Sequence, residues 1–106
     1  ILLVSCSARN EARDNFAKCL TEKGAVFYGA FWCPHCADQK KLFGNSMDYV
    51  NYVECSMPDK KGQTQICQQK NIPGYPTWDF SDGSRASDVL SFEDLGEKTG
   101  CTLPAA

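Results

Sequence analysis

The feature that most constrains this chain is a cysteine pair that directly follows an apolar segment. Residues 25–32 read Ala-Val-Phe-Tyr-Gly-Ala-Phe-Trp, and a Cys-Pro-His-Cys motif occupies residues 33–36. The apolar run has strand character, and residues 37–43 are good helix formers. Pro34 fits the first helical position because its missing N–H would have no partner there. The sequence therefore predicts a strand, a turn and a helix whose amino end carries two thiols.

This placement favours redox chemistry. Unpaired backbone N–H groups and the positive end of the helix macrodipole stabilise a thiolate at Cys33, which we expect to be the attacking and more exposed thiol. Cys36 lies within one turn and would resolve the mixed disulfide formed with a substrate. His35 is the only histidine in the chain, and its partial positive charge would further favour the Cys33 thiolate and a more oxidising disulfide.

Two other interpretations of the motif are a structural disulfide and half of a zinc site. A structural zinc ion needs four ligands, usually as two close pairs. Cys55 and Cys67 are the remaining candidates near the middle of the chain, but they are twelve residues apart and no second histidine is present. No metal site is therefore expected.

Composition narrows the class of protein. The 106 residues suit a single domain, and the apolar and charged contents of 42% and 23% are ordinary for a globular protein. A net charge of −2 provides no basic field, so a nucleic acid is not expected as a partner. Seven cysteines indicate an oxidising compartment, and their odd number leaves at least one without a partner inside the chain.

The pattern along the chain predicts one α/β domain over residues 11–106, preceded by an entry segment or linker over residues 1–10. The order is helix, strand, helix, strand, helix, two strands and helix, with these bounds: 11–23, 25–31, 34–44, 49–54, 63–70, 77–81, 85–90 and 92–99. A βαβ unit with Cys-x-x-Cys at its first strand-to-helix turn is the thioredoxin arrangement. We therefore expect a thioredoxin-like fold with a central four-stranded mixed sheet flanked by helices.

A second motif, Gly-Tyr-Pro-Thr-Trp at residues 74–78, places a proline at the start of a predicted strand. Such a proline is a candidate for a cis peptide bond, and an ordinary trans proline at a strand edge is the alternative. In the thioredoxin arrangement Pro76 would pack beside the active cysteines. The backbone of Tyr75 would then offer strand-like hydrogen bonds to an extended substrate peptide.

With these motifs in hand, the chain resembles the thioredoxin-like, DsbA-like domain of bacterial and plant vitamin K epoxide reductase homologues. The likeness covers roughly residues 15–101. It rests on Gly-Ala-Val-Phe-Tyr-Gly-Ala-Phe-Trp-Cys-Pro-His-Cys at 24–36, Asp-Gln-Lys at 38–40, Leu-Phe-Gly at 42–44, Tyr-Val-Glu-Cys at 52–55, Ile-Pro-Gly-Tyr-Pro-Thr-Trp at 72–78 and Leu-Gly-Glu-Lys-Thr-Gly at 95–100.

The resemblance implies a role in disulfide formation. The domain would take electrons from reduced secreted proteins through Cys33 and Cys36, with Trp32 and Tyr75 in the substrate-binding part of the site. It would pass the electrons to a membrane-embedded reductase domain of the same full-length protein, which hands them to a quinone. No cofactor is expected in this domain itself. The resemblance places the protein in a bacterial periplasm or a thylakoid lumen, tethered to the membrane.

The resemblance also implies a second disulfide, between Cys55 and Cys67. Closing that loop would stabilise the domain by roughly 3 kcal/mol in the chain-entropy model, and a regulatory or electron-relay role is the alternative to a structural one. Cys19 and Cys101 lie outside the family pattern, at the ends of the first and last predicted helices. A third disulfide between them is therefore left open, and Cys6 would then be the odd thiol.

One departure from the family pattern concerns the route of the Cys36 proton, and a separate open point concerns the start of the chain. Thioredoxins and disulfide isomerases carry a buried acid six residues before the first cysteine, where this chain has Phe27. The proton of Cys36 therefore needs another route, for which Asp38 and Glu54 are candidates. The apolar residues 1–4 fit either an apolar contact or the end of a preceding membrane helix.

Three competing functions stay open at this stage. A disulfide reductase or isomerase would need a more stable disulfide than an oxidant. A metal-binding module would use Cys33 and Cys36, with Met57 as a thioether ligand suited to Cu(I). A purely structural, disulfide-stapled binding domain would leave the Trp-Cys-Pro-His-Cys sequence at a helix start unexplained.

Overall fold

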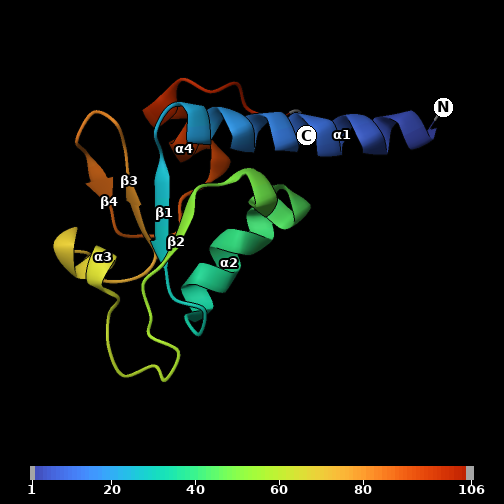
Figure 1. Ribbon diagram of the computed structural model, residues 1–106. Helices are drawn as coiled ribbons and strands as arrows, with labels where there is room; N and C mark the ends of the chain where they lie inside the picture. Colours follow the sequence, from blue (N-terminus) through green and yellow to red (C-terminus); the bar gives the residue numbers. More distant parts are fainter. Residues whose placement is uncertain (1, 105–106) are drawn as a thin grey trace.

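The computed structural model describes the backbone of residues 2–104 and the side chains of residues 10–104. Nine elements follow one another along the chain (Figure 1): α1 (Leu2–Glu22), β1 (Val26–Gly29), α2 (Pro34–Phe43), the 3₁₀ helix η1 (Gly44–Tyr49), β2 (Tyr52–Glu54), α3 (Gln65–Gln69), β3 (Thr77–Asp79), β4 (Arg85–Ala86) and α4 (Phe92–Thr99).

The four strands form one mixed sheet in the order β2-β1-β3-β4. β1 pairs in parallel with β2, with Phe27 opposite Tyr52, and antiparallel with β3, with Phe27 opposite Trp78. The β3–β4 pair is an antiparallel hairpin. β1 is therefore an interior strand, as its nearly continuous apolar sequence predicts, and the expected α/β fold with a thioredoxin-like mixed sheet is confirmed.

Each face of the sheet has its own core, because successive residues of a strand point to opposite faces. On one face, Phe27 and Trp78 pack with apolar residues from three helices: Phe16 and Leu20 of α1, Phe43 of α2 and Leu95 of α4. On the other face, Tyr28 packs with Ile72 and the two half-cystines at 55 and 67. Helix α2, which begins directly after Cys33, thus lies on the side with the larger core.

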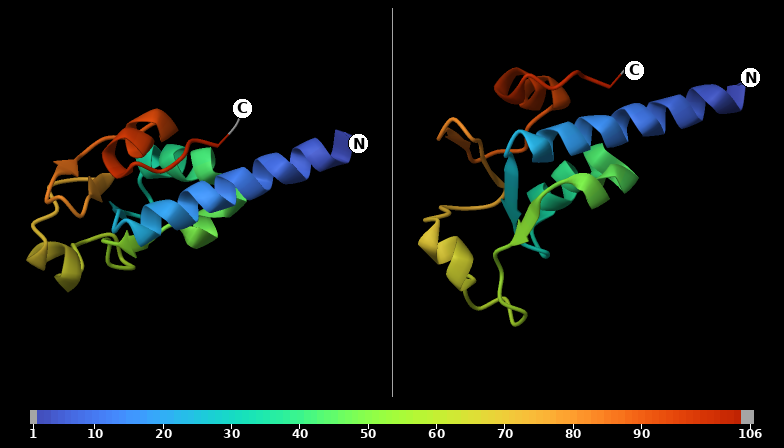
Figure 2. Two further views of the ribbon diagram at one scale, coloured as in Figure 1. Left: turned by 90° about the horizontal axis from the view of Figure 1, so that it is seen from above. Right: turned by 45° about the horizontal axis from the view of Figure 1, so that its top comes forward.

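The first helix is longer than the sequence predicted. It begins at Leu2 rather than at residue 11, so the expected linker segment over residues 1–10 is helical from Leu2 onward and continuous with the domain. Alanine, arginine and glutamate between residues 8 and 13 are good helix formers, and their polarity masked this. Figures 1 and 2 show α1 extending past the rest of the domain. It ends before Gly24, whose φ of +87° suits glycine.

All four strands are shorter than predicted, and β1 and β3 keep only Val26–Gly29 and Thr77–Asp79 of the predicted ranges 25–31 and 77–81. The strand predicted over 49–54 begins at Tyr52, since residues 44–49 instead form η1, and the Val50 N–H closes that turn on the Met47 carbonyl. The strand predicted over 85–90 ends at Ala86. Leu90 does not pair with a strand because its N–H and carbonyl both bond to the side-chain amide of Gln39, at 2.8 and 3.0 Å.

The last helix follows its sequence signals. The Ser91 hydroxyl accepts the Asp94 N–H at 3.1 Å, the Asp94 carboxylate accepts the Ser91 N–H, and together they form a capping box. Gly100 ends the helix in the left-handed conformation. None of the helices within residues 2–104 combines the length and the apolar character needed to cross a bilayer. Ile1 and the side chains of residues 2–9, Cys6 included, lie outside what the structure describes.

Candidate active site

The cysteine pair lies where β1 gives way to α2. Cys33 is the residue before the helix, with extended backbone angles, and Pro34 is the first helical residue. The Ala37 N–H closes the first turn on the Cys33 carbonyl at 3.1 Å. The Cys33 side chain keeps 8% of its surface exposed and Cys36 has none, so Cys33 is the accessible thiol of the two.

Burial makes the Cys36 thiol unusually hard to deprotonate. Desolvation raises the pKa of the Cys36 thiol to about 12, and its contact with Cys33 acts in the same direction. A hydrogen bond with the Ala30 backbone and the positive charge of Lys40 oppose the rise. Cys36 therefore holds its proton near neutral pH and reacts only if a neighbouring group removes that proton.

The loop before β3 lies against Cys33. The peptide bond between Tyr75 and Pro76 is cis, and Pro76 is buried. The Cys33 thiol donates a long hydrogen bond of 3.7 Å to the Tyr75 carbonyl. The structure thus brings together the residues of the two predicted motifs, which lie about forty positions apart in the sequence.

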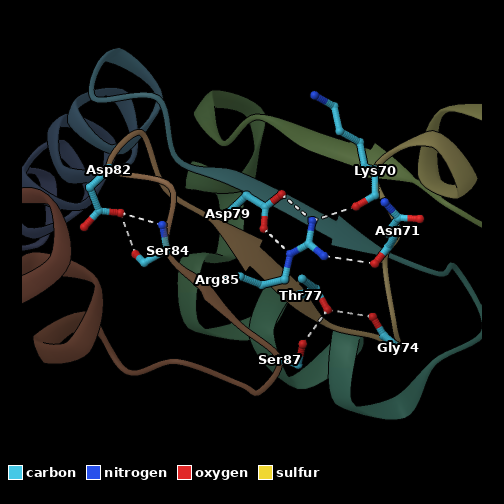
Figure 3. A network of polar contacts seen from close by, with 9 residues as sticks. All are labelled: Lys70, Asn71, Gly74, Thr77, Asp79, Asp82, Ser84, Arg85 and Ser87. Atoms are coloured by element: carbon cyan, nitrogen blue, oxygen red, sulfur yellow. Dashed lines mark hydrogen bonds and ion pairs between the residues drawn. The ribbon is translucent and has the colours of Figure 1, made fainter.

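Polar contacts at both ends hold this loop in place (Figure 3). At its start, Arg85 donates hydrogen bonds to the Lys70 and Asn71 carbonyls at 2.8 and 2.9 Å. The same guanidinium also donates to both carboxylate oxygens of Asp79 on β3. At its end, the Thr77 hydroxyl donates to the Gly74 carbonyl at 2.7 Å. The Tyr75 backbone is therefore fixed relative to the sheet.

The segment leading into Cys33 is held by the far end of β2. The Glu54 carboxylate accepts the Phe31 N–H at 3.0 Å, and the Trp32 indole N–H donates to the Ser56 hydroxyl at 2.7 Å. The Trp32 ring stands edge-on to the Tyr75 ring, with centroids 6.1 Å apart. Phe31 and Trp32 are each about half exposed, so apolar surface borders the accessible thiol.

His35 lies on the solvent side of the helix start. Its side chain is 75% exposed, and Nδ1 lies 4.0 Å from the Asp38 carboxylate one turn further on. Asp38 is itself well exposed. Both residues are thus on the outer surface of α2, on the side away from the buried Cys36.

Four other cysteines form two disulfides. Cys55 pairs with Cys67 of α3, across twelve residues, and both are fully buried. Cys19 pairs with Cys101 across 82 residues and joins the last turn of α1 to the segment after α4. The pairing that the sequence left open is thus present in the structure.

Sequence reasoning missed two side chains of this region. Gln39, fully buried on α2, accepts the Trp78 indole N–H at 3.0 Å and holds Leu90. Tyr52 on β2 donates to Glu54 at 2.8 Å. The polar Gln39 on the helix face that carries Cys36 and Phe43 was the only sequence signal for the first. Within residues 10–104, no three His, Cys, Asp or Glu side chains gather as they would around a metal ion.

Comparisons with known proteins agree with this site. No family model matches the chain. Over 94 residues the chain is 40% identical to "Thiol-disulfide oxidoreductase LTO1" of Arabidopsis thaliana. The match takes in 85% of this chain, which spans only about a quarter of the length of that relative. The chain is therefore a homologue of part of a thiol-disulfide oxidoreductase.

Proposed function

We propose that this homologue of a thiol-disulfide oxidoreductase is an oxidant of cysteines in folding proteins. One observation carries the proposal: a thiol pair at a helix start lies beside a fixed backbone carbonyl, with 3.7 Å between Cys33 Sγ and Tyr75 O. An extended peptide that binds along the Tyr75 backbone would present a cysteine to Cys33. The half-exposed Trp32 and Phe31 offer apolar contacts for the rest of that peptide.

The reaction is two thiol–disulfide exchanges. A substrate thiolate attacks Sγ of Cys33 in the Cys33–Cys36 disulfide, a mixed disulfide forms, and Cys36 leaves as a thiolate that takes up a proton. A second substrate thiolate then attacks the substrate sulfur of the mixed disulfide and releases Cys33 as a thiolate. The substrate gains one disulfide, and the domain gains two electrons.

The pair must then be reoxidised. We propose that the acceptor is a cysteine pair on a vitamin K epoxide reductase-type membrane domain in the same full-length protein, which passes the electrons to a quinone. The quarter-length match supports a larger protein around this domain. The four half-cystines of the two further disulfides support an oxidising compartment, and we propose a periplasm or thylakoid lumen with the protein tethered to the membrane.

The roles of the individual residues follow from this proposal. Cys33 is the residue that exchanges with substrate, and Cys36 resolves. Pro34 starts the helix, His35 places an imidazole near its amino end, and Pro76 sets the Tyr75 backbone beside the thiols. The disulfides Cys55–Cys67 and Cys19–Cys101 are structural, since each ties a helix to the rest of the domain.

The reduction potential of the Cys33–Cys36 pair tests the direction of electron flow. The domain is equilibrated with glutathione buffers and its free thiols are alkylated. The masses of its peptides are then measured by mass spectrometry. A potential of about −200 mV or higher supports an oxidant, whereas a value near the roughly −270 mV of thioredoxin would replace it with a reductase. The same peptides report whether the Cys55–Cys67 disulfide stays closed while the active pair opens.

A further inference from the structure

The thiol that resolves the mixed disulfide needs a base. In the buried Cys36 the thiol form is strongly favoured, yet attack on a mixed disulfide requires the thiolate. The side chain below it on β1, Phe27, is fully buried and apolar, so it can neither accept nor donate a proton. The group that takes the proton must come from another element.

A polar side chain close to Cys36 belongs to β2. A methyl group placed on Gly29 would meet Cε1 of Tyr52 at 2.9 Å and Sγ of Cys36 at 3.1 Å, so the edge of the phenol ring and the thiol both border the space above this glycine. The electrostatic influence of both thiols on the phenol reflects the same closeness, because Cys36 and Cys33 each raise the pKa of Tyr52, after burial and Glu54.

Tyr52 also contacts a carboxylate. Its hydroxyl donates to Oε1 of Glu54 at 2.8 Å, which leaves the phenol oxygen free to accept a proton from the other side. Oε2 of Glu54 accepts the N–H groups of Phe31 and Ser56, each at 3.0 Å, so the carboxylate is held in place. Glu54 is partly exposed and can exchange protons with water.

We propose that Tyr52 and Glu54 form the proton relay of Cys36, a proposal that rests on the exchange chemistry proposed above. In the resolving step the Cys36 proton passes to the phenol oxygen of Tyr52 while the Tyr52 proton passes to Glu54. The Cys36 thiolate attacks Sγ of Cys33, a Cys33–Cys36 bond forms, and the partner leaves as a thiolate. In the opposite direction, protonated Glu54 returns the proton as Cys36 becomes the leaving group.

The other titratable groups near the thiols are placed for different roles. Asp38 is exposed and faces His35 at the surface. The Lys40 ammonium lies over the Tyr52 ring, 4.3 Å from its centroid, and an ammonium group has no acceptor atom for a proton. The Tyr75 hydroxyl is occupied by the Gln63 amide at 3.0 Å. Among these groups, Tyr52 is the one that borders the space above Gly29 together with Cys36 and also donates a hydrogen bond to a carboxylate, that of Glu54.

The test separates the two thiol steps. The reduced domain reacts with a chromogenic aryl disulfide that releases one coloured thiolate at each attack. The first release comes from Cys33 and depends on reagent concentration, while the second comes from closure by Cys36 and does not. The variants are Glu54→Gln and Tyr52→Phe. The matched controls are Glu93→Gln, which removes an exposed carboxylate, and Tyr49→Phe, whose ring also carries a lysine above it.

We expect both site variants to slow the second release by roughly 10²-fold, the size of a general acid–base contribution, and to leave the first release unchanged. The pH profile of the second release should differ between the wild-type domain and Glu54→Gln, whereas Glu93→Gln should keep the wild-type profile. Equal slowing of both releases would assign Glu54 a purely structural role in holding the Phe31 segment, and overturn the relay. An unchanged second release in either variant, or slowing in Asp38→Asn instead, would also overturn it. If the wild-type domain shows no second release, Cys36 does not close the disulfide, and the proposed function itself is wrong.

Discussion

The thiol of Cys33 points at the backbone carbonyl of Tyr75, 3.7 Å away, although 42 residues separate the two in the sequence. This contact joins the start of the redox helix to the loop before β3. The accessible thiol and the Tyr75 backbone, along which we propose that a substrate peptide binds, therefore share one surface.

Labelling of Cys36 should depend steeply on pH. Because burial raises the pKa of Cys36 to about 12, its thiolate fraction should grow by about tenfold per pH unit up to that value. Alkylation of the reduced domain, resolved by peptide mass, should modify Cys33 first and Cys36 only as the solution becomes strongly alkaline. In urea the Cys36 rate should instead level off near the ordinary thiol pKa of 9.0. Equal rates for folded and unfolded Cys36 at neutral pH would contradict this.

The longer disulfide should contribute more stability than the shorter one. In the chain-entropy model, opening the 82-residue Cys19–Cys101 loop costs about 4.5 kcal/mol, and opening the 12-residue Cys55–Cys67 loop costs about 3 kcal/mol. The measurement is urea unfolding of the paired Cys→Ser variants, in a background with Cys33→Ala and Cys36→Ala so that the active pair does not interfere. The reverse order of the two losses would show that packing around Cys55 outweighs loop length.

Replacement of Gln39 by leucine should destabilise the domain by roughly 3 kcal/mol. The change leaves the Trp78 indole N–H and both backbone groups of Leu90 without partners in a buried site, and each orphaned group costs about 1–3 kcal/mol before relaxation. The exposed Gln69→Leu variant serves as the control. A loss below about 1 kcal/mol in thermal or urea unfolding would mean that water replaces the amide.

Gly29→Ala should be destabilising although Gly29 has ordinary backbone angles. The new methyl group would lie about 3 Å from Tyr52, Cys36 and Phe27, and overpacking of this kind costs roughly 1–3 kcal/mol. Gly74→Ala is the matched control, since a methyl group there meets nothing within 4 Å. Unfolding midpoints of the two variants should therefore separate clearly, and coincident midpoints would disprove the close approach at Gly29.

Local sequence signals predicted the elements that depend on near neighbours. The turn from the first strand into Pro34, the cap at Ser91 and the stop at Gly100 all follow rules that act within a few residues. The alternating pattern over 49–54 failed at its start, because Tyr49 belongs to a 3₁₀ helix that packs under α1, where the Thr21 hydroxyl bonds its carbonyl.

The residues of the site also divide into those that local sequence signals predict and those that depend on the folded arrangement. Cys33 and Cys36 are recognisable from spacing alone, whereas the contribution of Tyr52 depends on strand register. Its ring borders the same space above Gly29 as Cys36 because β2 pairs in parallel with β1 in this register. The Cys19–Cys101 pairing likewise depends on α1 and the segment after α4 lying side by side, which no local pattern encodes.

The buried amide of Gln39 has a further consequence for how this domain communicates its oxidation state. Through that one side chain, the helix that carries the cysteines is fastened to Trp78 in β3 and to Leu90 after β4. We therefore expect the helix to keep its place when the two sulfurs at its start form a bond. A partner would then distinguish the two forms by the chemistry of the Cys33 sulfur rather than by a shift of the helix.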